Sequence, residues 1–380
     1  MDPLFIFYDI HELIIQHFNY NDIFRIFKVS KYWHCLILEN SKFAMRKIRL
    51  NVHESNHDEV YNVLDQKISE MNSDVLDLLE SQRKYQNIKV YVDHGWDFID
   101  QLVRNLAESL VSIEVSSDIF VENLKIPNLK FLKLDNPLLE GLTSCSNKLK
   151  KLAVRMSGRE YWLKKESPIA IKSALKKNSQ LEVIELDEDL TSIIFESNIS
   201  SDVNFRLKRL CIEFLKFNND EEIFGNARKF LEKQQNLTNL AIKFPDSPTI
   251  QWIYENQTNL ESFQIKIHFE QNPRDFQVIS NGAIKCLDLD ISSNWQYTMN
   301  IKFALRTFIT STPNLEVLKI RMTSPLEIDD FRFLLFNSLK LKKLYQNADE
   351  CLHTYNEIYE QIRQDHDNIS PNVEFFNNSD

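Results

Sequence analysis

A short apolar pattern, L-x-x-L-x-L with other apolar residues allowed at each leucine position, recurs along most of this chain of 380 residues. Successive copies start 19 to 32 residues apart, with a mean of about 26. A period of this size indicates a solenoid, in which each repeat buries its apolar face against its neighbours. The copies start at Leu110, Leu129, Leu149, Leu181, Leu207, Leu237, Leu260, Ile284, Leu315 and Leu341.

Each copy alternates apolar and polar residues, which is typical of a short strand that buries one face. Amphipathic helices are expected between the copies, for example over residues 220–236 and 246–257. Asp220 is the expected N-cap of the first helix. Ser247 is the expected N-cap of the second, with Pro248 at its first helical position. The pattern predicts an α/β fold, an irregular solenoid with a concave parallel sheet and outer helices.

Period, strand and helix together resemble a leucine-rich repeat, and this region is expected to span residues 47–348. The ninth position of such a repeat commonly carries asparagine or cysteine. Neither residue stands there in this chain, so we expect repeats whose boundaries shift by several residues. The eight residues found at this position are Pro137, Ser157, Asp189, Leu215, Pro245, His268, Ser292 and Thr323.

The C-terminal region departs from the repeat pattern. Residues 349–367 carry an amphipathic pattern with Leu352, Ile358 and Ile362 on one side, which predicts a capping helix over the last repeat. Residues 368–380 follow it, and we expect them to form a disordered tail.

Glycine is scarce in this chain, which has five residues of this type, and no two of them are closer than 17 positions. The usual nucleotide-binding loops and the serine-hydrolase elbow need closely spaced glycines, because their backbones approach a phosphate or make a strained turn. The sequence therefore argues against these two enzyme classes. Its histidines and acidic runs also suggest no metal or catalytic site, so we expect a protein that is not an enzyme, with no catalytic residues, no cofactor and no metal.

Charge, hydropathy and cysteine content indicate which partners and which cell compartment to expect. The formal net charge is −10 and no basic block stands out, which argues against nucleic acid as a partner. No apolar run approaches the ~18 residues that a membrane helix needs, so no membrane is expected as a partner. Five widely spaced cysteines without a C-x-x-C pair indicate reduced thiols, as in a cytoplasmic and/or nuclear protein.

Residues 1–46 are expected to form a separate unit of three short helices, because apolar residues recur there at helical spacing. This unit resembles an F-box, whose pattern runs E-L, then F, D-L and V-S-x-x-W. The chain has Asp9-Ile10 where the family has Leu-Pro. The matching residues are Glu12, Leu13, Phe18, Asp22, Ile23, Val29, Ser30 and Trp33.

An F-box followed by leucine-rich repeats resembles the substrate receptors of SCF-type cullin–RING ubiquitin ligases. The resemblance implies that the F-box docks on a Skp-type adaptor of the ligase core, and that the repeats hold a protein substrate of unknown identity. The alternative is a repeat scaffold that binds a protein without ligase coupling, which the Asp9-Ile10 departure keeps open. The candidate adaptor contacts are Ile10, Leu13, Ile14, Phe18, Ile23, Val29 and Trp33.

The concave face should carry the third, fifth and seventh positions of each repeat, where charged residues are frequent. One interpretation is a solvated face with cross-strand ion pairs of little individual strength. The other is a substrate surface with mixed charge complementarity. No aromatic ladder accompanies the lysines, so stacking of nucleic-acid bases is not expected. The candidate substrate contacts are Glu185, Asp187, Glu213, Lys243, Lys266, Asp288, Asp290, Lys319 and Arg321.

One further motif, HESNH at residues 53–57, has the H-E-x-x-H spacing of zinc proteases and leaves a zinc hydrolase as a remote alternative. Zinc binding of this type needs both histidines in the middle of a helix. Ser55 and Asn56 between them prefer caps and turns. The sequence therefore favours a strand-to-helix turn at His53, Glu54 and His57.

Overall fold

The structure is a computed structural model that describes the residues from Lys47 onward in segments separated by gaps. The chain divides into two compact units, residues 1–116 with 126–129, and residues 117–125 with 130–380. The predicted F-box of residues 1–46 lies outside the described residues. The described segments are 47–52, 86–92, 103–116, 125–135, 146–155, 173–188, 190–191, 195, 205–214, 221–269, 279–293, 298–322, 327–346, 352–365 and 373–377.

The described residues of the first unit include three parallel strands. β1 (Lys47–Val52) pairs with β2 (Asn87–Val92), which pairs with β3 (Ser112–Ser116). The polar face of this sheet carries an ion pair of 2.8 Å between Lys89 Nζ and Glu114 Oε1 on adjacent strands. Regular parallel pairing therefore begins before the first L-x-x-L-x-L copy that the sequence shows.

The second unit is built on parallel strands that follow one another in chain order. Neighbouring strands pair in a constant register, with Leu210 opposite Leu240 and Leu240 opposite Phe263. Each repeat therefore adds one strand beside the last, and the predicted α/β fold with a parallel sheet is present. The strands are β4 (Phe131–Asp135), β5 (Lys151–Arg155), β6 (Val183–Leu186), β7 (Arg209–Glu213), β8 (Asn239–Lys243), β9 (Ser262–Phe269), β10 (Cys286–Ser293), β11 (Val317–Met322), β12 (Lys343–Gln346) and β13 (Glu374–Asn377).

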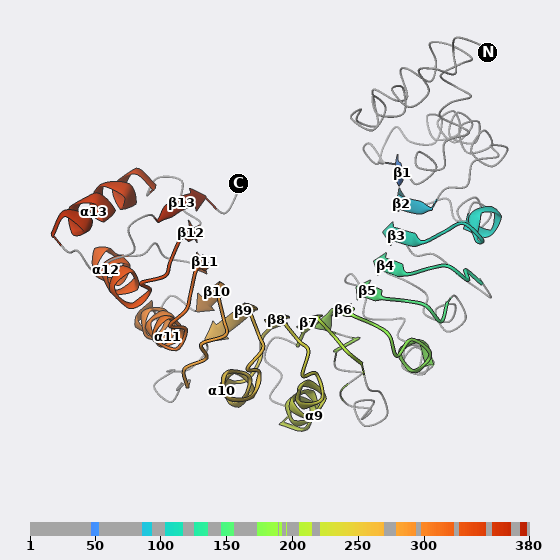
Figure 1. Ribbon diagram of the computed structural model, residues 1–380, viewed down its shortest axis with the longest axis horizontal. Helices are drawn as coiled ribbons and strands as arrows, with labels where there is room; N and C mark the ends of the chain where they lie inside the picture. Colours follow the sequence, from blue (N-terminus) through green and yellow to red (C-terminus); the bar gives the residue numbers. More distant parts are fainter. Residues whose placement is uncertain are drawn as a thin grey trace, which may run out of the picture. The chain divides into compact units, whose positions relative to one another are not determined.

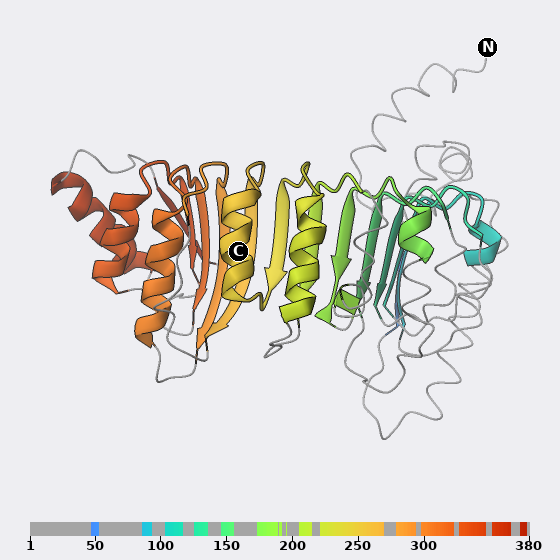
Figure 2. The same cartoon turned by 90° about the horizontal axis from the view of Figure 1, so that it is seen from below.

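Helices cover one face of this second sheet. They connect successive strands and lie side by side in a layer of their own (Figures 1 and 2). Because β-strand neighbours run parallel, each return crossing needs such a connection. The longer helices of the described segments are α9 (Glu221–Glu232), α10 (Ser247–Asn256), α11 (Thr298–Thr310), α12 (Ile328–Asn337) and α13 (Leu352–Asp365).

The core lies between the helices and the sheet. The first leucine or isoleucine of each L-x-x-L-x-L copy precedes its strand and is fully buried, as Leu237, Leu260 and Ile284 illustrate. Within the strands, alternate residues such as Leu240 and Ile242 also point into the core. The apolar pattern therefore marks the buried positions correctly, because each side chain removed from water in one repeat is covered by the next.

The predicted N-cap of α10 is wrong by one residue. Asp246 is the cap, and its Oδ1 accepts a hydrogen bond of 3.0 Å from the backbone N–H of Thr249. Ser247 and Pro248 occupy the first two helical positions. An aspartate cap is electrostatically favoured here, because its negative charge lies at the positive end of the helix dipole.

Buried polar side chains occur three residues before the first leucine position of several repeats. Asn178 donates to the carbonyl oxygens of Ser146 and Ala174, and its own oxygen accepts from Leu149 N. Gln257 lies at the equivalent position of a later repeat and donates to a carbonyl of the preceding repeat. These side chains satisfy backbone groups that burial would otherwise leave unpaired. We call Asn178, Gln257 and Asn281 the polar ladder.

The C-terminal region is partly as expected. α13 lies within the range predicted for the capping helix. The expectation of a disordered tail is wrong for Glu374–Asn377, which form β13 and pair with β12. Phe375 explains the difference, because its ring contacts the rings of Phe331 and Tyr359 at centroid distances of 5.7 and 5.5 Å. The apolar side chain gives this segment a place in the core.

Candidate protein-binding surface

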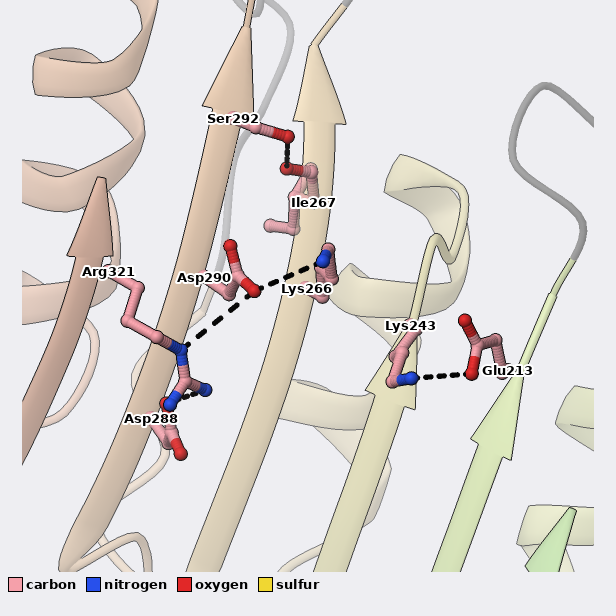
Figure 3. Close-up of polar contacts among 8 residues, drawn as sticks. All are labelled: Glu213, Lys243, Lys266, Ile267, Asp288, Asp290, Ser292 and Arg321. Carbon is pink, nitrogen blue, oxygen red and sulfur yellow. Dashed lines mark hydrogen bonds and ion pairs between the residues drawn. The ribbon is translucent and has the colours of Figure 1, made fainter. Parts of the chain in front are cut away.

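The sheet of the second unit has an inner face, defined as the face opposite helices α9–α13. The strand residues that alternate with the core positions lie on it, and many of them are charged (Figure 3). Strand pairing brings equivalent positions of successive repeats into rows. One row consists of the seventh residues of the five repeats that contain β7–β11, namely Glu213, Lys243, Lys266, Asp290 and Arg321. The predicted substrate residues of these strands are therefore neighbours in space.

Arg321 on β11 joins two of the predicted acidic residues. Its guanidinium group lies 2.7 Å from Asp288 and 3.8 Å from Asp290, both on β10. Lys266 Nζ on β9 lies 3.3 Å from Asp290 Oδ2, the same oxygen that faces Arg321 (Figure 3). This network links three adjacent strands through four side chains. It fixes the charged groups relative to the sheet, because each cation is held by at least one carboxylate.

Asp288 is the most strongly perturbed carboxyl group of this network. Burial raises its pKa, and the negative charge of Asp290 acts in the same direction, while Arg321 opposes both. The carboxylate is thus desolvated and depends on Arg321 for compensation. The ion pair with Arg321 therefore also fixes the position of the Asp288 carboxylate on the sheet.

Two other acidic residues on the inner face are also paired with basic residues. Glu213 lies 2.5 Å from Lys243 on the next strand. Glu185 lies 2.8 Å from Lys151 and 3.9 Å from Arg209, on the strands on either side of it. The carboxylates of this face therefore occur within cross-strand pairs, and the ion-pair interpretation made from the sequence is correct for these residues.

Asp187 is the exception among the predicted substrate contacts. It follows the last residue of β6, and its Oδ1 accepts a hydrogen bond of 3.2 Å from Leu190 N. The side chain therefore caps the turn that begins there. Aspartate commonly binds backbone N–H groups in this way just beyond a strand.

Lys319 lies opposite Asp288 on the adjacent strand, at the C-terminal end of the inner face. Its Nζ is 4.8 Å from the ring centroid of Tyr345 on β12. Tyr345 stacks on Phe376 of β13 at 4.7 Å with an interplanar angle of 16°. Two aromatic residues therefore accompany Lys319 at this end, although the sequence predicted no aromatic ladder beside the lysines. Phe376 was missed because it follows the last L-x-x-L-x-L copy.

A second charged row runs along the edge where the strands begin, at the second position of each repeat. Glu182 lies 3.3 Å from Lys150 and 2.8 Å from Lys208, and Glu316 lies 2.6 Å from Lys342. Hydrogen bonds from Lys208 and Lys150 lower the pKa of Glu182. This row of acidic and basic residues was not predicted from the sequence, although its members recur at the repeat period.

Several predicted residues lie outside the described segments. They are the adaptor contacts Ile10, Leu13, Ile14, Phe18, Ile23, Val29 and Trp33, and the HESNH residues His53, Glu54 and His57. Within the described segments, no group of three or more His, Cys, Asp and Glu residues is arranged to hold a metal ion. No helix in that part of the chain has both the length and the apolar character to cross a membrane.

Comparison with known proteins adds no relative. No protein-family model matches the chain, and no curated protein is significantly similar to it in sequence.

The inner face offers charged and aromatic side chains on a regular lattice of parallel strands. Such a lattice can contact an extended or folded protein surface at many points, with a spacing of about 5 Å between strands. Its charges are paired, so a partner that forms new ion pairs must compete with existing ones. The arrangement is suited to recognition of a macromolecule by several weak contacts.

Proposed function

We propose that this protein is a non-catalytic substrate-recognition subunit of an SCF-type cullin–RING ubiquitin ligase. In this proposal residues 1–46 act as an F-box that docks on a Skp-type adaptor, and the repeats bind a protein substrate. The observation that carries it is the order of the two elements: an F-box-like pattern precedes a repeat sheet whose inner face is charged.

The repeat sheet supports a binding role for physical reasons. Its charged side chains are held by neighbours on adjacent strands, for example Glu213 by Lys243 and Asp288 by Arg321. A surface that is already organised loses less conformational entropy when a partner binds. Charged rows also accelerate association with a partner of complementary charge.

Co-purification with the adaptor tests the ligase proposal. The full chain and its Trp33→Ala variant are each co-expressed with a Skp-type adaptor, and the complex is quantified after size-exclusion chromatography. We expect a one-to-one complex with the unmodified chain and its loss with Trp33→Ala. Trp252→Ala, on α10 of the repeat region, is the control and should leave the complex intact.

A gain-of-binding variant keeps this test decisive if Trp33→Ala fails to fold. Replacing Asp9-Ile10 by Leu-Pro restores the family pattern and should tighten adaptor binding. Absence of a complex with both the unmodified chain and this variant would contradict the ligase proposal.

The second candidate function is a repeat scaffold that binds a protein without ligase coupling. The Asp9-Ile10 departure favours it, since the family carries Leu-Pro at these positions. The two functions differ in the adaptor experiment alone, because both require a partner on the repeats. A chain that captures a protein through its inner face but never binds the adaptor would support the scaffold.

A further inference from the structure

The inner face of the second unit has the opposite charge balance to the chain as a whole. The chain carries 45 basic and 55 acidic residues. On the inner-face positions of β4–β13, basic residues outnumber acidic ones by nine to six. The basic residues are Lys133, Lys151, Arg155, Arg209, Lys243, Lys266, Lys319, Arg321 and Lys343, and the acidic residues are Asp135, Glu185, Glu213, Asp288, Asp290 and Glu374.

The excess of basic residues is concentrated on the last three strands. β11–β13 carry Lys319, Arg321 and Lys343 but only one acidic residue on this face, Glu374. Arg321 is paired with Asp288 and Asp290 of β10, which leaves Lys319 and Lys343 as the surplus cations. Glu374 lies 3.9 Å from Lys343, near the limit of an ion pair, and its carboxylate is mostly exposed. Water screens such a pair, so it neutralises little of the local positive charge.

Aromatic rings accompany two of these cations. Lys319 Nζ lies 4.8 Å from the centre of the Tyr345 ring, and Lys343 Nζ lies 5.6 Å from the centre of the Phe376 ring. The two rings stack on each other at 4.7 Å. We call Lys319, Lys343, Tyr345 and Phe376 the basic–aromatic cluster. The rings restrain the ammonium groups and leave N–H donors for an anion, since a ring contacts one side of an ammonium group.

We propose that the basic–aromatic cluster binds an anionic segment of a protein partner, with carboxylate or phosphate groups between Lys319 and Lys343. This inference rests on the proposal that the inner face holds a protein, and it names the chemical class of the segment recognised. Charge complementarity carries it: a net acidic chain keeps surplus cations on one face, and an anionic segment neutralises them. Acidic side chains and phosphorylated serine share this chemistry.

A protein segment fits the inner face better than a nucleic acid does. A polyphosphate backbone carries regularly spaced negative charges and would meet the carboxylates of Asp288, Asp290 and Glu213 on the neighbouring strands. Stacking of bases also needs open ring faces. Tyr345 and Phe376 cover each other, and Lys319 lies over Tyr345. A segment with a few localised negative charges avoids both conflicts.

Fluorescence polarisation with the full chain tests this proposal. The probes are short labelled peptides of one length: alternating Glu and Ser, alternating phosphoserine and Gly, alternating Lys and Ser, and alternating Gln and Ser. A single-stranded oligonucleotide is the fifth probe. We expect the two anionic peptides to bind, the phosphoserine one more tightly if phosphate is the preferred group, and the affinity to fall with added salt. The other three probes should bind more weakly than the better anionic peptide.

Matched variants assign the binding to the cluster. The double variant Lys319→Gln and Lys343→Gln should weaken the better anionic peptide by about tenfold, which corresponds to about 1.4 kcal/mol. The control, Lys229→Gln with Lys285→Gln, removes the same charge from α9 and from the turn before β10, and should leave affinity within about twofold. Glu374→Gln should tighten binding, because it releases Lys343.

Several outcomes would overturn the proposal. They are failure of both anionic peptides to bind, equal loss in the cluster and control variants, and tighter binding of the oligonucleotide than of either peptide. None of them depends on the adaptor. Adaptor co-purification can therefore succeed while this proposal fails, or fail while the cluster still binds anionic peptide.

Discussion

The side chain of Asn281 donates a hydrogen bond of 3.1 Å to the carbonyl oxygen of Gln257, which lies 24 positions earlier in the chain. The same amide donates to Tyr254 O at 3.2 Å. A single buried asparagine therefore satisfies two carbonyl groups of the preceding repeat. Contacts of this kind fix the spacing of repeats, because an unpaired buried carbonyl group is costly.

Asn178→Ala should lower the free energy of unfolding by about 1–3 kcal/mol. The change removes three hydrogen bonds, and the buried amide of Leu149 loses its acceptor. Urea denaturation followed by circular dichroism measures the effect. Asn256→Ala is the control, since Asn256 is exposed on α10 and bonds within its own helix. Equal effects of the two changes would contradict the role of the ladder.

Phe375→Ala should destabilise the second unit by about 2 kcal/mol, because the ring packs against Phe331 and Tyr359. Phe376→Ala, one position along, is the matched control. Its ring lies on the inner face against Tyr345, so the loss should be smaller. Thermal unfolding of both variants compares them. If Phe376→Ala proves the more damaging, β13 does not contribute to the core as described.

The raised pKa of Asp288 should make the free energy of unfolding depend on pH. Burial and the charge of Asp290 raise its pKa in the folded state, so the folded state holds this proton to higher pH than the unfolded state does. The contribution of Asp288 to stability is therefore largest below its unfolded pKa and is lost as the pH rises through the raised folded value. Asp288→Asn removes this titration.

Urea unfolding of the two proteins at a series of pH values measures the difference. Relative to Asp288→Asn, the unmodified protein should lose stability between the unfolded pKa of about 4 and the raised folded pKa. A constant difference across the acidic range would show that the carboxyl group of Asp288 is not perturbed.

The pair formed by Glu213 and Lys243 should contribute little to folding. The two groups lie 2.5 Å apart, but Lys243 is partly exposed, and exposed pairs contribute about 0–1 kcal/mol. A double-mutant cycle with Glu213→Gln and Lys243→Gln measures the coupling by urea unfolding. A coupling energy above about 2 kcal/mol would instead make this pair a structural element of the sheet.

The sequence predicted the strands better than it predicted the surface. The apolar positions of L-x-x-L-x-L determine which side chains meet in the core, so the register of Leu240 opposite Phe263 followed from the pattern. The apolar pattern does not predict hydrogen bonds of side chains just beyond a strand, such as the one that Asp187 accepts from Leu190 N.

The polar ladder and the basic–aromatic cluster were missed for a related reason. Asn178, Gln257 and Asn281 share an offset of three residues from the apolar pattern but differ in residue type, so an alignment of apolar positions passes over them. Phe376 belongs to β13, whose strand has only two apolar residues. Its ring stacks on Tyr345 because β13 pairs with β12, and the spacing of apolar residues does not predict that strand pairing.

The side-chain amides of Gln257 and Asn281 both donate to carbonyl groups of the preceding repeat. The Asn281 side chain binds the carbonyl oxygens of Tyr254 and Gln257, and the Gln257 side chain binds the carbonyl oxygen of Leu231. During synthesis, a repeat that leaves the ribosome therefore stays incomplete until the next one follows it. Chains arrested before Asn281 should be cut by protease near Gln257, and chains arrested beyond β10 should resist it. We therefore expect this part of the sheet to assemble in chain order, because the carbonyl groups of Leu231, Tyr254 and Gln257 accept hydrogen bonds from side chains translated later.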